Sequence, residues 1–147
     1  MENNLVIKKI NNDQINQNLS TIFDLIKQLN EDLTYEQFEQ YLQNMLKMNY
    51  FLITATLNNE IVAICGCWSG YRFYCGKYLE IDNFVVSEKC RGQKIGDKMI
   101  KFLINLAKKQ NYQKMTLAAY LENKSAHKFY DKYGFEYWGY HRVLVFK

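Results

Sequence analysis

The sequence lacks proline altogether, and it lacks any hydrophobic run long enough to mark a membrane span. Asparagine and lysine are abundant, a bias that we attribute to codon composition rather than to chemistry. The hydrophobic fraction is 48%, yet no apolar run approaches the roughly 20 residues that a membrane-spanning helix needs. Charged residues are mixed along the chain, which favours a folded globule over a disordered segment. We therefore expect a folded protein with no membrane partner.

The spacing of the cysteines indicates neither a CxxC motif nor a metal site. Cys65, Cys67, Cys75 and Cys90 form no CxxC pair, and neither histidine stands at a metal-ligand spacing from them. We expect reduced thiols, a cytoplasmic location and no metal site. The net charge of +4 is small and the lysines are scattered without a recognised nucleic-acid motif. We therefore expect no nucleic-acid partner, although a mild positive charge suits an anionic ligand.

Hydrophobic periodicity predicts the element order β-α-α-β-β-β-α-β-α-β. Strands are predicted over 5–10, 50–57, 61–68, 77–86 and 114–119, with one long or two short strands over 135–146. Helices are predicted over 15–29, from a capping box at Thr34 to Leu46, from about Ile95, and over 123–133, where Gly134 ends the last one. Segment 69–76 is predicted to be a loop. With no repeat and no linker, residues 1–147 form one predicted α/β domain.

The segment KCRGQKIGDKMI, residues 89–100, places a glycine-bearing turn between a strand and a helix. The first turn of a helix leaves N–H groups without partners, and its dipole favours an anion. Arg91 adds a planar cation that is suited to phosphate. The segment is therefore a candidate phosphate site. The alternative is that Gly92 and Gly96 serve only as caps or packing points and that Arg91 is a solvated surface charge.

Two blocks in this sequence resemble the signature of the GNAT superfamily of acyl-CoA-dependent N-acyltransferases. The first is EIDNFVVSEKCRGQKIGDKMI, and the second combines Asn123, Ala126, Phe129 and Tyr130 with Gly134-Phe135. Their order and spacing are far more specific than either block alone. The resemblance implies a single-domain fold with a mixed, mostly antiparallel, twisted sheet of six to seven strands flanked by about four helices.

The resemblance also implies acetyl-CoA as cosubstrate, with its phosphates on the turn and its pantetheine arm beside the preceding strand. The residues that it assigns to cofactor binding are Phe84, Val85, Val86, Arg91, Gly92, Gln93, Lys94, Ile95, Gly96, Asp97 and Asn123. Lys94 departs from the family pattern, which usually has glycine at that position. If the position requires a positive φ, the lysine side chain costs roughly 1–2 kcal/mol.

Acyl transfer to an amine needs a group that removes a proton, because a primary amine with a pKa near 10.4 is mostly charged at neutral pH. Glu80 and Asp82 lie two apart on one predicted strand and so share a face. The resemblance makes Asp82 the first candidate base and Glu80 the second, and it makes Tyr130 the candidate general acid. The alternatives are a solvated strand face for the carboxylates and plain packing for Tyr130.

The acceptor pocket is expected to draw on the first two helices, on segment 69–76 and on the C-terminal strands. Its candidate residues are Glu31, Asp32, Tyr35, Trp68, Tyr71, Tyr74 and Trp138. Carboxylates among aromatic rings suit a small cationic amine, and a lysine or N-terminal peptide amine nearly as well. We expect a monomer or a homodimer. A catalytically degenerate CoA-binding sensor or scaffold is the alternative function, and a basic nucleic-acid-binding domain is a more distant one.

Overall fold

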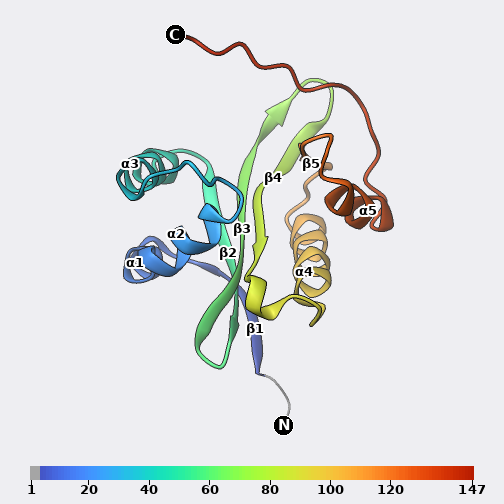
Figure 1. Ribbon diagram of the computed structural model, residues 1–147. Helices are drawn as coiled ribbons and strands as arrows, with labels where there is room; N and C mark the ends of the chain where they lie inside the picture. The colour runs from blue at the N-terminus through green and yellow to red at the C-terminus, as the bar shows by residue number, and fades with distance from the viewer. Residues whose placement is uncertain (1–3) are drawn as a thin grey trace.

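The computed structural model describes residues 4–147, so residues 1–3 of the predicted domain lie outside the described part. A central sheet is covered by helices on both faces, with α1, α2 and α3 on one side and α4 and α5 on the other (Figure 1). Within the described residues, no helix is long and apolar enough to cross a membrane.

The sheet contains five strands in the spatial order β1-β2-β3-β4-β5. They are β1 (Leu5–Ile10), β2 (Tyr50–Leu57), β3 (Glu60–Arg72), β4 (Gly76–Val86) and β5 (Lys114–Leu117). All neighbours are antiparallel except β4 and β5, which are parallel. The predicted mixed, mostly antiparallel sheet is therefore confirmed, but it has five strands among residues 4–147 rather than six to seven.

The helices are α1 (Asn12–Gln17), α2 (Leu19–Lys27), α3 (Tyr35–Leu46), α4 (Ile95–Lys109) and α5 (Lys124–Lys132), with a short 3-10 turn η1 (Glu88–Cys90). The described part thus has five α-helices rather than the expected four or so. The difference arises at Asn18, where the predicted helix over 15–29 divides into α1 and α2. The Asn18 side chain donates to the Gln14 carbonyl at 2.7 Å, a local bond that competes with continuous helix geometry.

Each face of the sheet has its own hydrophobic core. Against α4, the sheet residues Ile53 and Leu79 pack on Met99 and Leu103, which are fully buried. On the opposite face, Leu52 and Ile64 belong to a second cluster with residues of α1, α2 and α3. Because side chains alternate along a strand, neighbouring positions of β2 serve opposite cores.

Several local predictions are confirmed. The hairpin between β2 and β3 turns on Asn58 and Asn59, whose φ angles are 51° and 68°. Thr34 and Gln37 form the predicted reciprocal capping box at the start of α3. Gly134 takes a φ of 87° just after α5, as expected for a residue that ends a helix.

The predicted loop over 69–76 is wrong. β3 continues to Arg72 and β4 begins at Gly76, so only a tight turn remains between them. The Tyr78 ring lies over its cross-strand partner Gly70, and the Arg72 guanidinium stacks on that ring at 4.0 Å. This cross-strand packing extends the hairpin through a stretch whose glycines and polar residues resemble a loop.

The predicted closing strand over 135–146 is also wrong. Phe135 packs on α5, but residues 136–147 form no regular structure and are exposed. A strand needs a neighbour to accept and donate its backbone hydrogen bonds. This segment leads away from the sheet and ends outside the body of the molecule (Figure 1), so its high β propensity has no ladder to join.

Candidate active site

β4 and β5 pair over only four residues. Their register runs from Tyr78 opposite Lys114 to Ile81 opposite Leu117, and it goes no further. Beyond Ile81, residues 83–86 of β4 pair only with β3 within the described part of the chain, and Asp82 has no cross-strand partner there. One edge of β4 is therefore open along this stretch, and an extended ligand could pair with it as an added strand.

The open stretch begins at a β-bulge. Gly66 on β3 lies opposite Asn83 and Cys67 lies opposite Ile81, so Asp82 is the extra residue on β4. A bulge re-aims the side chains beside it. Here the neighbouring residues Asp82 and Asn83 both contact aromatic side chains on the face covered by α1, α2 and α3.

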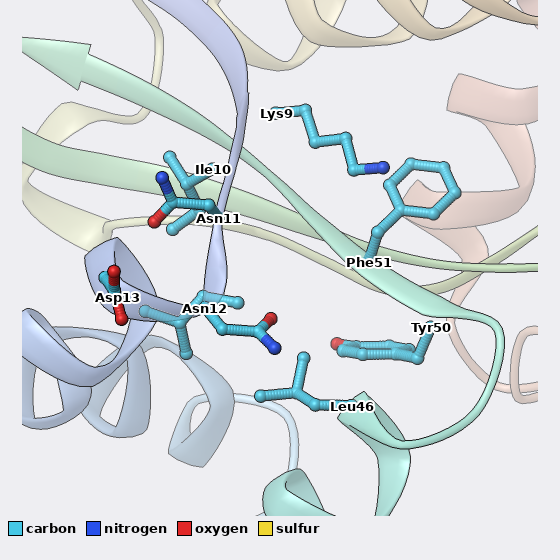
Figure 2. A pocket seen from close by; sticks show the side chains of 9 residues that line it. Lys9, Ile10, Asn11, Asn12, Asp13, Leu46, Tyr50 and Phe51 are labelled. Atoms are coloured by element: carbon cyan, nitrogen blue, oxygen red, sulfur yellow. The ribbon is translucent and has the colours of Figure 1, made fainter.

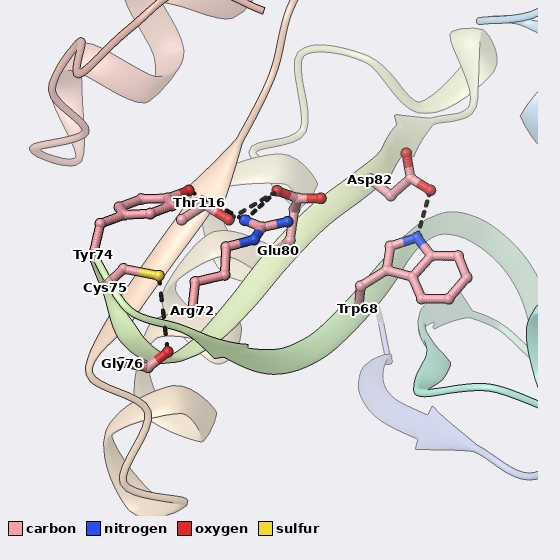
Figure 3. A network of polar contacts seen from close by, with 8 residues as sticks. All are labelled: Trp68, Arg72, Tyr74, Cys75, Gly76, Glu80, Asp82 and Thr116. Carbon is pink, nitrogen blue, oxygen red and sulfur yellow. Dashed lines mark hydrogen bonds and ion pairs between the residues drawn. The ribbon is translucent and has the colours of Figure 1, made fainter.

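Two aromatic residues hold the bulge from β2 and β3. The Trp68 indole N–H donates to Oδ2 of Asp82 at 2.8 Å (Figure 3), and the Tyr50 hydroxyl donates to Oδ1 of Asn83 at 3.3 Å. The two rings lie 5.1 Å apart between centroids. Burial, and secondarily the Asp82 charge, raises the pKa of the Tyr50 hydroxyl, so it stays a donor. Tyr50 covers Gly66 so closely that a Cβ there would lie 2.1 Å from its hydroxyl oxygen.

The two candidate bases share a face of β4 but not an environment. Glu80 pairs with Arg72 at 3.4 Å and accepts a hydrogen bond from Thr116 of β5 at 3.0 Å (Figure 3). Arg72 in turn contacts the Tyr74 hydroxyl at 3.3 Å. Among residues 4–147, Asp82 has a side-chain hydrogen bond with Trp68 alone, and it is exposed. Asp82 is therefore the carboxylate that a substrate can reach, whereas Glu80 is bound in a network.

After β4, the chain forms the turn that the sequence singled out. Gly92 has a φ of 80°, and Lys94 has a φ of 60° and precedes the first residue of α4. Position 94 thus adopts the left-handed conformation, although it carries a side chain. A hollow of about 230 Å³ is lined here by Val86, Cys90, Arg91, Gly92, Lys94, Ile95, Gly96 and Asp97. Gly96 lines the hollow and also borders β4, since a Cβ at this position would lie 3.6 Å from the Phe84 ring.

The start of α4 has no side-chain cap among the described residues, a feature that it shares with α2 but not with α1, α3 or α5. Asn11, Thr34 and Asn123 accept hydrogen bonds from the first turns of α1, α3 and α5. The Lys94 side chain carries no acceptor atom. The first N–H groups of this 15-residue helix therefore face the hollow with the positive end of the helix dipole.

Asp97, in the first turn of α4, points sideways rather than capping the helix. Its carboxylate accepts hydrogen bonds from Lys132, at 2.6 Å, and from the Tyr133 hydroxyl, both near the end of α5. These two donors, Lys132 first, hold the pKa of Asp97 below its ordinary value. The contact ties the turn that bears the hollow to the helix that carries Tyr130.

Tyr130 lies beside the open stretch of β4. Its ring packs edge-on to Phe84 at 6.4 Å between centroids, and it also contacts Phe129 and Phe135 at 5.3 and 5.4 Å. Burial in this aromatic cluster, helped by the Cys65 thiol, raises the pKa of its hydroxyl above the ordinary value of 10.0. The hydroxyl is therefore held in its protonated, donating form.

Asn123 is the N-cap of α5, a role that the sequence analysis did not predict. Its side-chain oxygen accepts from the Ala126 N–H at 3.2 Å and from the Ser125 hydroxyl at 3.1 Å, which caps α5. Only its NH₂ group remains for a ligand. The side chain thus fixes the start of the helix that carries Tyr130.

The predicted acceptor residues are only partly brought together. Trp68 and Tyr74 lie in the network around Asp82 and Glu80. Tyr35 instead packs on Phe23 at 5.3 Å. The remaining candidates, Glu31, Asp32, Tyr71 and Trp138, lie in exposed turns, at the end of β3 or in the C-terminal segment.

Sequence reasoning missed four residues of this network: Tyr50, Arg72, Asn83 and Thr116. The one signal that could have found the bulge is Gly66, a glycine inside a strand pattern, which often marks a bulge or a close approach.

A larger hollow, of about 450 Å³, lies at the far edge of the sheet between the end of β1 and the start of β2 (Figure 2). Two of the polar or charged side chains that line it are held in local contacts. Asn11 caps α1, and the Lys9 ammonium lies 4.7 Å from the centre of the Phe51 ring. Tyr50 borders this hollow and also reaches Asn83. We assign the hollow no catalytic role.

Several known proteins that resemble this chain are described as acetyltransferases. A family model described as the acetyltransferase (GNAT) family matches residues 16–135. The uncharacterized N-acetyltransferase YhdJ of Bacillus subtilis (strain 168) is 29% identical over 115 residues, which cover 77% of this chain and 81% of that protein. The aminoalkylphosphonate N-acetyltransferase of Salmonella typhimurium is 24% identical over 123 residues, or 82% of this chain and 80% of the relative.

A solved structure of another acetyltransferase shares the fold. The solved structure of the aminoglycoside N-acetyltransferase AAC(6')-Iy in complex with CoA superposes with a TM-score of 0.78 at 15% identity, covering 100% of this chain and 96% of that one. The family match spans well over half of the chain and includes the β4 bulge, the turn before α4 and Tyr130. The chain therefore belongs to the GNAT family and is an acyl-CoA-dependent acetyltransferase.

Proposed function

We propose that this protein transfers an acetyl group from acetyl-CoA to the primary amine of a small cationic acceptor, by direct attack in a ternary complex. The observation that carries the proposal is the coincidence of two features on β4. The strand loses its β5 partner after Ile81, and the bulge exposes the Asp82 carboxylate at the next residue. An extended thioester on the open edge would therefore begin beside a proton acceptor.

The residues of this chain fit the cosubstrate at both ends. The uncapped first turn of α4 supplies N–H donors for a pyrophosphate, and Arg91 and Lys94 line the same hollow with positive charge. The open edge of residues 82–86 supplies backbone groups for the amide-containing pantetheine arm. Acetyl-CoA supplies the activated acyl group.

In the proposed reaction, the amine nitrogen forms a bond to the thioester carbonyl carbon, and the carbon–sulfur bond breaks. The amine must first lose a proton, because its pKa near 10.4 leaves it charged at neutral pH. Asp82 accepts that proton, directly or through a water, while Trp68 fixes the orientation of the carboxylate. When the tetrahedral intermediate collapses to the amide, the nitrogen's second proton passes to the departing sulfur, and Asp82 returns the first proton to solvent. The products are therefore an N-acetyl amine and a CoA thiol.

Tyr130 serves the leaving group. The departing sulfur carries negative charge, and a tyrosine hydroxyl held in its protonated form can donate to it. A tyrosine near pKa 10 is a weaker acid than a thiol near 8.5, so we assign Tyr130 a strong hydrogen bond in the transition state rather than complete early transfer. A backbone N–H near Phe84 is our candidate donor to the carbonyl oxygen.

The acceptor class follows from the exposed acidic charge. Asp82 is exposed and stands next to the Trp68 ring, and Glu80 lies two residues away on the same face. This combination attracts an ammonium group. The names of an aminoalkylphosphonate and an aminoglycoside acetyltransferase among the similar proteins support a small amine rather than a protein tail.

The test measures CoA thiol release from acetyl-CoA with a panel of aminoglycosides, aminoalkylphosphonates, polyamines and lysine-bearing peptides. We expect turnover with one of the small amines. Turnover with peptides alone would show that the acceptor is a peptide amine rather than a small amine, and the proposed acetyl transfer from acetyl-CoA would still hold. CoA binding by calorimetry without turnover on any amine would favour a CoA-binding sensor. Absence of heat with CoA at millimolar ligand would remove the cosubstrate assignment altogether.

A further inference from the structure

The helix that carries Tyr130 is poorly buried. None of the residues of α5 is buried, whereas α4 has five buried residues along its length. The apolar contacts of α5 are made by partly buried aromatic rings, such as that of Phe129, which lies 5.7 Å from Phe84 and 5.2 Å from Tyr133 between centroids. Because the hydrophobic effect is non-directional, such contacts hold the helix near the sheet more strongly than they fix its exact position.

The polar contacts between α5 and the rest of the fold converge on one acidic residue. Among residues 4–147, the side chains of α5 and of its C-cap Tyr133 make hydrogen bonds to another helix or strand only at Asp97. The Lys132 ammonium lies 2.6 Å from Oδ1 of Asp97, and the Tyr133 hydroxyl donates to the same oxygen. We call these two hydrogen bonds the Asp97 contact. They join α5 to the first turn of α4.

The place of Asp97 is not explained by a role in binding an anion. Its residue lines the hollow that precedes α4, where a carboxylate would repel a pyrophosphate. Lys132 offsets that charge from α5. Tyr130 stands three residues before Tyr133, so the two side chains lie on the same side of the helix, one turn apart. The Asp97 contact therefore joins the hollow to the turn of α5 that bears the candidate acid.

We propose that Asp97 is a positioning residue for the acetyl transfer, and that it sets α5 so that the Tyr130 hydroxyl meets the sulfur of a thioester whose phosphates occupy the adjoining hollow. The inference rests on the proposed function, because it takes the hollow as the phosphate site and Tyr130 as the donor to the leaving group. A displacement of about 1 Å in a reacting group can lower a rate by about 10²-fold. Loss of the Asp97 contact should therefore reduce the rate rather than the binding of acetyl-CoA.

Amide hydrogen exchange of the free protein tests the Asp97 contact without reference to catalysis. In Asp97→Ala, the amides of residues 127–133 should exchange about 10-fold faster, whereas those of residues 99–107 in α4 should keep their protection. Asp131→Ala is the matched control, because it removes an exposed carboxylate of α5 that has no side-chain hydrogen bond among the described residues. Unchanged exchange in Asp97→Ala would show that the contact does not hold α5, and it would overturn the proposal.

Steady-state kinetics distinguishes positioning from binding. Asp97→Ala should lower kcat by about 10-fold without raising KM for acetyl-CoA, because it frees α5 and also removes a negative charge from the hollow. Lys132→Met breaks the same ion pair from α5 and should lower kcat too, but it leaves the Asp97 charge uncompensated, so KM should rise. A raised KM with an unchanged kcat in Asp97→Ala would make Asp97 a binding residue and overturn the proposal.

A double-mutant cycle shows whether Asp97 acts through Tyr130. Added to Tyr130→Phe, Asp97→Ala should lower kcat further by less than about twofold, because the hydroxyl that it positions is already absent. Losses that multiply would mean that Asp97 acts independently, and the proposal would be wrong. A slow Tyr130→Phe variant beside a fully active Asp97→Ala variant would overturn this inference alone. A fully active Tyr130→Phe variant would remove the donor role in the proposed function, and the inference would fail with it.

Discussion

Trp68 on β3 donates its indole N–H to the carboxylate of Asp82 on β4, at 2.8 Å, across the bulge that makes Asp82 the unpaired residue of its strand. The contact uses one oxygen of the carboxylate and fixes its direction. Glu80, two residues earlier, is already committed to Arg72 and Thr116. The two acids on one face of β4 are therefore distinguishable by experiment.

Asp82→Asn should lower kcat by about 10²-fold while the binding of CoA is unchanged. The asparagine keeps an oxygen that can accept from Trp68, so the bulge is preserved and only the proton acceptor is lost. Steady-state kinetics and CoA titration of the same preparation measure the two effects. Glu80→Gln is the matched control and should retain most of the activity. A larger loss in the Glu80 variant than in the Asp82 variant would exchange their roles.

Tyr130→Phe should lower kcat by about 10²-fold and leave the melting temperature nearly unchanged. The phenylalanine ring keeps the packing against Phe84, Phe129 and Phe135, and only the hydroxyl disappears. Tyr133→Phe, which removes a hydroxyl from the same helix and loosens the Asp97 contact, serves as the control. An equal fall in kcat in the two variants would show that activity depends on the position of α5 rather than on a hydrogen-bond donor at Tyr130.

The pH dependence of Tyr130 has a defined sign. Burial raises its pKa in the folded protein above the ordinary 10.0. Its contribution to stability is therefore fully present below the unfolded value and declines as the pH rises above about 10. The free energy of unfolding, measured by denaturant titration, should fall less steeply above that pH in Tyr130→Phe. The wild-type rate should show no loss from Tyr130 ionisation at lower pH.

Lys94→Gly should stabilise the fold by up to about 1 kcal/mol. The left-handed conformation destabilises a residue with a side chain by roughly 1–2 kcal/mol. Glycine avoids this strain, but its greater loss of chain entropy on folding offsets about 0.5–1 kcal/mol of the gain. Lys94 has a φ of 60°, so the relief applies at this position. Thermal unfolding should show a rise of about 2–4 °C.

Lys94→Ala separates conformation from charge. It removes the ammonium but keeps the strained backbone, so its stability should not rise, whereas both variants should bind CoA more weakly. If the alanine variant gained as much stability as the glycine variant, strain at residue 94 would not be the cause.

Thr54→Val should raise the free energy of unfolding by about 1 kcal/mol. The Thr54 hydroxyl is fully buried in β2 and has no hydrogen-bond partner among the described residues. Valine has nearly the same shape and leaves no polar atom unsatisfied. Thr56→Val, two residues further along the same face and only partly buried, should change stability by less than about 0.5 kcal/mol. Equal effects at both sites would indicate a general gain in strand propensity.

The sequence was sufficient for features that rest on local chemistry. Asn58 and Asn59 marked a hairpin because asparagine tolerates positive φ, and Thr34 with Gln37 marked a helix start because the two reciprocate hydrogen bonds. The family resemblance rests on two motifs that lie in such local segments. It led correctly to the acetyltransferase family.

The features that the sequence did not reveal depend on contacts between distant residues. The bulge at Asp82 is a matter of register between β3 and β4, and Tyr50 enters the site only because Gly66 leaves room for its ring. The strand predicted over 135–146 failed for the same reason. The segment has a high β propensity, but a strand must form backbone hydrogen bonds with a neighbouring strand, and β propensity does not specify which strand that is.

The bulge also determines which residues of β4 face α4. Before it, the odd-numbered Leu79 and Ile81 face α4, and after it the even-numbered Phe84 and Val86 do so. Deleting Asp82 would convert the bulge into a regular ladder, because Asn83 would then follow Ile81 directly, and Phe84 would keep its place facing α4 and Tyr130. The bulge thus lets β4 carry one additional residue, an exposed carboxylate, without changing the packing of the strand on either side of it.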